Sequence, residues 1–296
     1  MSETLKRVKE TLSGVSLSVR WWTPSRAARP QEQEAAAVAK QSRRVKVRKE
    51  VIDTKHPAWQ SLVSCRTAIR SWFDYVTIPY VVTGQRLFLR ERRQEIWDKV
   101  EVFATDLRTR AVALDDVRDE LIAEAQESLG DAHDDSLFPV RWSDVFGIEI
   151  REHSIEPPSY LAYSNAEEYA REMQRTLSDL GTSMQRFESQ CMAQMGESAA
   201  RLAANLDDNG RVMSSNVESF QKVFARVAQM KFEGTAIFKQ ALGEAQEILD
   251  GVGADELRHN RGLRTETRGR LQTLMARFHG LQSTVAAKHQ EESAPV

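Results

Sequence analysis

The fold is decided by residues 169–206, which read YAREMQRTLSDLGTSMQRFESQCMAQMGESAARLAANL. Apolar side chains recur there every three or four positions, the spacing that places them along one face of an α-helix. Two later runs repeat the pattern, at 220–249 and 271–285. We therefore predict three long helices, each with one apolar stripe. The apolar positions of the three runs are Met173, Leu177, Leu180, Met184, Phe187, Cys191, Met195, Leu202 and Leu206; Phe220, Val223, Phe224, Val227, Ile237, Phe238, Leu242, Ile248 and Leu249; and Leu271, Leu274, Phe278, Leu281 and Val285.

Two turn signals separate these three runs. One is Asp207-Asp208-Asn209-Gly210 and the other is Gly251-Val252-Gly253, and there is no proline from residue 159 to residue 294. Short connections between helices usually reverse the chain, so we favour an antiparallel bundle or hairpin. A single rod that tolerates its glycines is the alternative.

The chain changes character at Pro157-Pro158. All six tryptophans and seven of the eight prolines occur within residues 1–158. A double proline cannot continue a helix, and Ser164 or Asn165 can cap the helix that follows, with Glu167 and Glu168 in its first turn. We predict a mixed helical domain with short strands over 1–158 and a long helical hairpin or bundle over 159–296.

Strands and helices alternate in the first half. Residues 15–21 and 146–150 alternate apolar with polar side chains, which indicates two strands that could pair in a small sheet covered by helices. Helical spacing over 59–76 and 96–121 predicts two helices. Weaker patterns suggest a loop over 22–30, a short helix over 31–40, a strand over 45–51 and an apolar turn over 78–84. The fold class is thus mainly α, with long antiparallel helices and a small β element in the N-terminal half.

Composition points to a water-soluble protein. The net charge is -2, and 28% of the residues are charged. No apolar run reaches the roughly 18 residues that a membrane span requires, and residues 1–10 lack the apolar core of a signal peptide. Cys65 and Cys191 each lie in a helical apolar pattern, so we expect two buried thiols in a reducing compartment. We expect a cytoplasmic location and no membrane partner.

The sequence offers little for catalysis. It contains no G-x-x-x-x-G-K-[ST] loop, no G-x-S-x-G elbow, no H-E-x-x-H and no zinc-like spacing of cysteine or histidine. The acidic loop with Asp131, Asp134 and Asp135 lacks the spacing of a calcium site, so we interpret it as a solvated loop. We predict that the protein is not an enzyme and binds no cofactor or metal. A concealed active site around Asp74, Tyr75 and His153 is the alternative.

Two basic clusters are candidate binding sites. Between residues 40 and 49, six of ten side chains are basic: Lys40, Arg43, Arg44, Lys46, Arg48 and Lys49. The second cluster, with several members expected on one helical face, consists of Arg258, Arg261, Arg264, Arg268 and Arg270. Either cluster could contact the phosphates of a nucleic acid. The other interpretation is a solvated face, or docking on an acidic protein surface such as the one around Asp115, Asp116, Asp119, Glu120 and Glu124.

Several short segments together resemble a known family. They are the strand at 15–21, the junction Leu137-Phe138-Pro139 with Trp142 and residues 145–148, the double proline and the long helical tail. The resemblance is to a family of unknown function in bacteriophages and bacteria, often encoded beside MoxR-type AAA+ ATPases and von Willebrand A-domain proteins. It implies an accessory partner of an ATPase and no catalytic residues.

Apolar stripes without catalytic motifs favour a function in binding. The face with Met173, Met184, Cys191, Met192 and Met195 fits internal packing, but methionine-rich faces also adapt to partners. We therefore predict a non-catalytic helical interaction or assembly protein, with an AAA+ ATPase as a possible partner and self-association into a homo-oligomer as a further use of a stripe. A nucleic-acid-binding accessory protein that uses residues 40–49 is the alternative.

Overall fold

The structure is a computed structural model that describes residues 10–27, 48–206, 212–229, 235–248 and 253–292. It contains two compact units. The helical unit takes its residues from 1–14, 75–90 and 154–296, and the tryptophan unit from 15–74 and 91–153. The prediction of a mainly α-helical protein with a small β element is confirmed. The predicted division into one domain over 1–158 and another over 159–296 stays a prediction.

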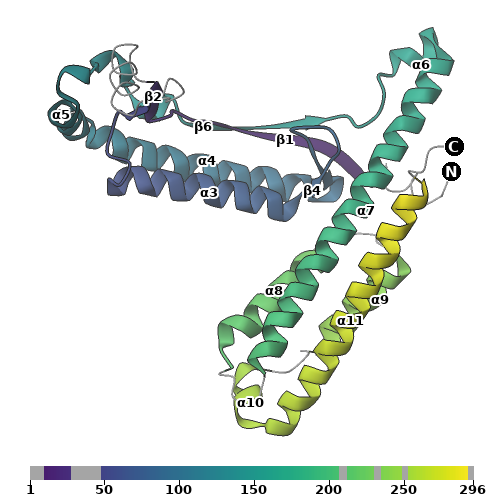
Figure 1. The fold of residues 1–296 in the computed structure, drawn as a ribbon. Coiled ribbons are helices and arrows are strands. Elements are labelled where there is room, and N and C mark those ends of the chain that lie inside the picture. The colour runs from purple at the N-terminus through teal and green to yellow at the C-terminus, as the bar shows by residue number, and fades with distance from the viewer. Residues whose placement is uncertain (1–9, 28–47, 207–211, 230–234, 249–252, 293–296) are drawn as a thin grey trace, which may run out of the picture. The chain divides into compact units, whose positions relative to one another are not determined.

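The helical unit is an antiparallel bundle. Its elements are α6 (Tyr160–Ser164), α7 (Ala166–Asn205), α8 (Ser214–Gln229), α9 (Ala236–Ile248), α10 (Ala254–His259) and α11 (Arg261–Glu292). Figure 1 shows α7 and α11 side by side and running in opposite directions, and α8 and α9 pack along them. The helices are therefore antiparallel, as we favoured from the sequence. They outnumber the three predicted helices because, among other differences, the second apolar run supplies both α8 and α9.

The apolar stripes form the core of this bundle. Met192, Met195 and Cys191 are buried in α7, so this part of the methionine face is internal packing. They lie in one cluster with Phe220 of α8 and Phe278 of α11. Of the two capping residues predicted as alternatives, Ser164 and Asn165, Asn165 begins α7, because its side-chain oxygen accepts a hydrogen bond from the backbone N–H of Glu168 at 3.1 Å.

A short hairpin completes the helical unit. Strands β4 (Ile78–Pro79) and β5 (Arg86–Leu89) pair antiparallel, with Ile78 opposite Leu87. The segment 78–84, predicted as a turn alone, therefore begins with a strand and continues into the turn where Gly84 has a positive φ of 80°. The hairpin is attached to α7, since the backbone N–H of Val81 donates to Ser183 Oγ at 3.2 Å.

The tryptophan unit combines helices with short strands. Its elements are most of β1 (Leu12–Arg20), β2 (Ser25–Ala27), β3 (Arg48–Glu50), most of α3 (Pro57–Val76), α4 (Arg93–Asp116), α5 (Arg118–Leu129) and β6 (Gly147–His153). The larger sheet has the order β4-β5-β1-β6, and β2 pairs with β3. The two strands expected at 15–21 and 146–150 are therefore neighbours. The loop expected over 22–30 contains β2, and the strand expected over 45–51 corresponds in part to β3.

One predicted helix is two helices in the structure. The pattern over 96–121 is interrupted at Val117, where α4 ends and α5 begins. Neither glycine nor proline marks this break. It is fixed by contacts on both sides: the Asp115 carboxylate accepts from the backbone N–H groups of Trp142 and Ser143 at 2.5 and 3.1 Å, and Arg118 Nε donates to Pro139 O at 3.1 Å.

Candidate interaction groove

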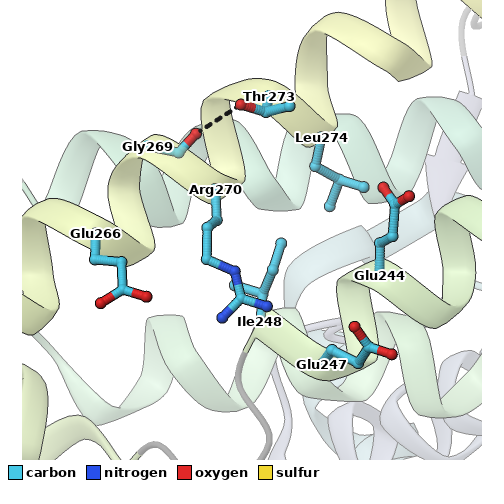
Figure 2. Close-up of a pocket in the computed structure, with 8 residues that line it drawn as sticks. All are labelled: Glu244, Glu247, Ile248, Glu266, Gly269, Arg270, Thr273 and Leu274. Carbon is cyan, nitrogen blue, oxygen red and sulfur yellow. Dashed lines mark hydrogen bonds between the residues drawn. The ribbon is translucent and has the colours of Figure 1, made fainter.

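A groove of about 420 Å³ lies between α9 and α11 in the helical unit. Figure 2 shows Arg270 extending from α11 into the space between the two helices, with Glu244 and Glu247 on the α9 side and Glu266 on its own helix. Ile248 and Leu274 supply apolar surface beneath them and are themselves buried. Gly269 and Thr273 complete the lining.

A buried carboxylate in α7 fixes the start of α9. Thr235 precedes the helix, and its Oγ1 accepts from the backbone N–H of Phe238 at 3.3 Å, as an N-cap residue does. The same hydroxyl donates to Glu188 Oε1, and the backbone N–H of Thr235 donates to Glu188 Oε2 at 3.3 Å. Glu188 is only 7% exposed. The α9 wall of the groove is therefore anchored by a charged group of the bundle core.

The α11 wall is positioned at its start and along its length. Asn260 caps the helix by accepting from the backbone N–H of Leu263 at 3.0 Å. Leu271, Leu274 and Phe278 are buried in the bundle core. Arg277 forms an ion pair with Glu244 across the two helices, which links the walls at one end of the groove. Thr273 Oγ1 donates to Gly269 O at 3.1 Å, as Figure 2 shows, so its hydroxyl proton is already used.

The lining is acidic with an apolar floor. Glu244 is already paired with Arg277, so Glu247 and Glu266 face the single guanidinium of Arg270 and leave a formal charge of −1. Lysine and arginine side chains combine an apolar stem with a terminal cation, and charge-assisted hydrogen bonds to carboxylates are the stronger ones. The groove is thus suited to a cationic side chain that packs its stem along the lining and reaches Glu247 and Glu266.

Most of the predicted basic site at 40–49 lies outside the described residues, namely Lys40, Arg43, Arg44 and Lys46. Arg48 is exposed on β3. Lys49 is half-buried, and its Nζ donates to Ala132 O at 2.6 Å. Arg48 is therefore accessible to a ligand, whereas Lys49 holds the loop at 130–132 in place.

The second basic cluster is divided between two helices. Arg258 belongs to α10, where it contacts Val212 O at 2.8 Å, Ser214 Oγ at 2.8 Å and Asp255 at 2.5 Å. It therefore ties α10 to the beginning of α8. Arg261, Arg264, Arg268 and Arg270 follow in α11, and Arg270 is the member that lines the groove. The break at Asn260 separates Arg258 from the others.

The acidic loop uses its side chains for local structure. Asp134 Oδ1 accepts from the backbone N–H of Ser136 at 3.1 Å, and Asp135 pairs with His133 at 2.8 Å. Within the described residues, no group of three or more His, Cys, Asp or Glu side chains is arranged to hold a metal ion. No helix in the same residues is long and apolar enough to cross a membrane.

Both cysteines are buried as predicted. Burial raises the pKa of the Cys191 thiol to about 12. Burial, and then a hydrogen bond from Cys65 Sγ to Asp106 at 3.4 Å, raise the pKa of Cys65 to about 11. A thiol with a raised pKa holds little thiolate at neutral pH and is a poor nucleophile.

The residues of the alternative active site have different neighbours. His153 Nε2 lies 2.7 Å from Ser16 Oγ on the adjacent strand. Tyr75 lies in the helical unit, where its ring faces the guanidinium of Arg226 at 5.0 Å and its carbonyl accepts from Arg226 Nε at 3.2 Å. Asp74 and His153 belong to the tryptophan unit.

Of the groove residues, Arg270 was singled out in the sequence as a basic residue, and Ile248 and Leu274 as apolar ones. The carboxylates Glu244, Glu247 and Glu266 were not, because an exposed glutamate on a helix is ordinary. Comparison of the chain with protein-family models, with curated proteins and with solved structures finds no match.

Proposed function

We propose that this chain is a helical interaction protein that binds a partner protein and catalyses no reaction. The observation that supports this most is the acidic groove between α9 and α11, which has charge, apolar surface and about 420 Å³ of space. Its walls come from helices held by the Glu188–Thr235 contact and by the Arg277–Glu244 pair. A rigid groove loses little conformational entropy when a partner binds.

The partner chemistry follows from the lining. A segment rich in lysine or arginine would place a cation near Glu247 and Glu266, both exposed. The resemblance noted in the sequence adds an AAA+ ATPase as the class of partner protein, and assembly with such a machine is part of the proposal. Arg270 repels a cation placed beside it. The groove would therefore discriminate against segments whose only complementary feature is their positive charge.

Binding of a labelled Arg/Ala-repeat peptide, followed by fluorescence anisotropy, tests this function. The groove variant is Glu247→Lys/Glu266→Lys, which reverses two exposed charges. The matched control, Glu197→Lys/Glu218→Lys, makes the same change at exposed pairs with Arg201 and Lys222 outside the groove. We expect the groove variant to weaken binding about tenfold or more and the control to change it much less. Equal loss in both variants would reduce the effect to net charge and reject the groove.

Nucleic-acid binding is the second candidate. It is supported by the six basic side chains at 40–49 and by the exposure of Arg48. Phosphate contacts make affinity fall steeply with salt. Reversing Lys40, Arg43 and Arg44 to glutamate should abolish retardation of a DNA or RNA probe in a gel and flatten its salt dependence. Unchanged retardation would remove this candidate.

A further inference from the structure

Two arginines on one face of α3 lie in the tryptophan unit, and one of them stacks on Trp21. Arg66 and Arg70 are four residues apart, so their side chains are neighbours on the helix surface. The Cζ atom of Arg66 lies 4.5 Å from the centroid of the Trp21 ring. Such stacking uses the flat face of a guanidinium, whereas hydrogen bonds use the N–H groups at its edge.

The aromatic ring beneath Arg66 is held in position by the core. Trp21 contacts Phe146 at a ring-centroid distance of 4.8 Å and Trp59 at 5.6 Å. Both of these rings are buried, and Trp21 packs against the cluster to which they belong. The orientation of the Arg66 guanidinium is therefore set by packing and not by an ion pair.

The positive charges of the two arginines are not neutralised by the residues that the structure describes. Arg66 Nε is buried and its N–H has no acceptor, and Arg70 forms no ion pair, either with Asp74 one turn further along or with another described residue. Burial, and then the charge of Arg70, lower the pKa of Arg66. Like charges at this spacing repel each other, and a buried donor without an acceptor costs free energy. An anion at this place would relieve the repulsion.

We infer that Arg66 and Arg70 bind a phosphate group that carries about two negative charges, as inorganic phosphate and phosphate monoesters do. Side chains four positions apart on a helix have Cβ atoms about 5–6 Å apart, so the two guanidiniums can converge on one tetrahedral anion. The buried Nε is out of reach, so Arg66 donates from its terminal Nη groups. The three acceptor oxygens of a phosphate monoester are enough for both arginines. A carboxylate or a phosphate diester has one charge and would leave one arginine uncompensated.

This site is independent of the groove and goes beyond the proposed function. Isothermal titration calorimetry of the full chain with methyl phosphate tests it, at about pH 8, where the monoester is a dianion because its second pKa is about 6. Dimethyl phosphate is the matched ligand, since it has the same tetrahedral centre and one charge fewer. We expect methyl phosphate to bind at least about tenfold more tightly than dimethyl phosphate.

Variants of the two arginines locate the binding. Arg66→Gln and Arg70→Gln each remove one guanidinium and should weaken the binding of methyl phosphate about tenfold or more. Arg66→Lys keeps the charge but not the planar fork that stacks on Trp21, so it should recover only part of the affinity. Arg108→Gln, at an exposed arginine of α4, makes the same change in net charge and should bind as the wild type does.

The inference is overturned if the wild type does not bind methyl phosphate, if both glutamine variants bind it as well as the Arg108→Gln control, or if dimethyl phosphate binds equally tightly. Far-UV circular dichroism establishes that each variant is folded, and Arg70→Gln changes an exposed side chain, so the test does not depend on Arg66→Gln alone. Inorganic phosphate, titrated in parallel, should also bind, and its affinity relative to methyl phosphate shows whether the ester group contributes. The groove-binding peptide should bind all variants alike, which separates this site from the groove.

Discussion

The contact between Glu188 and Thr235 should contribute more to stability than any exposed ion pair of the bundle. Glu188 is 7% exposed, and both of its oxygens accept from Thr235, whose hydroxyl in turn accepts from the N–H of Phe238. Glu188→Ala removes the acceptor for two donors at the start of α9. Each of the two hydrogen bonds to the carboxylate contributes about 1.5–3 kcal/mol. Part of this loss is offset because the variant no longer has to bury a carboxylate. We expect a net loss of about 2–3 kcal/mol in the free energy of opening α9.

Hydrogen exchange measured by mass spectrometry gives this free energy for the peptides that cover α9. Thr235→Ala and the double variant complete a thermodynamic cycle, in which we expect a coupling of about 1.5–2 kcal/mol between the two side chains. The control is Glu197→Ala, which removes an exposed α7 carboxylate paired with Arg201 at 3.1 Å. It should cost about 0.5 kcal/mol or less. If Glu188→Ala costs no more than Glu197→Ala, or if the coupling is near zero, the anchoring role assigned to Glu188 is wrong.

Two further predictions concern the half-buried carboxylate of Asp115 and the buried thiol of Cys191. Asp115→Ala should lower the free energy of unfolding of the tryptophan unit by about 2–3 kcal/mol, because the N–H groups of Trp142 and Ser143 lose their acceptor. Urea unfolding followed by tryptophan fluorescence measures this loss. A loss equal to that caused by Asp116→Ala, at an exposed position, would contradict the prediction. The pKa of Cys191 is raised from 9.0 to about 12, so the folded state keeps a proton that the unfolded state releases, and stability present below pH 9 is lost as the pH rises toward 12. Between pH 9 and pH 12 the thiol should make the free energy of unfolding fall by about 1.4 kcal/mol per pH unit. Cys191→Ala should remove this contribution, and an unchanged slope would show that the fold does not keep the thiol protonated.

The helical unit was largely predictable because its information is local. The spacing from Met173 to Leu206 is that of α7, and Asn165 is a good N-cap residue wherever it occurs before such a run. The division of the second run into α8 and α9 had two adjacent local signals in the sequence between Val227 and Ile237, Gly234 and Thr235, and Thr235 caps α9. The division was missed because apolar spacing alone was followed across this stretch.

Other features depend on contacts between distant residues. The end of α4 at Val117 is held by Asp115 and Arg118, whose partners Trp142 and Pro139 lie more than twenty positions away. Similarly, Arg258 looked like one of a row of basic side chains until Val212 and Ser214 were seen beside it. The groove combines residues of α9 and α11, and no periodic pattern within either helix indicates that the two helices face each other there.

Affinity capture from the source cell, quantified by mass spectrometry, tests the central claim that the protein functions by binding a partner through the groove. The baits are the wild type, the groove variant Glu247→Lys/Glu266→Lys and the control Glu197→Lys/Glu218→Lys, each with and without nuclease. We predict one protein captured in stoichiometric amount by the wild type and the control, kept after nuclease treatment and lost with the groove variant. Equal capture by all three baits, or capture that disappears with nuclease, would contradict the account.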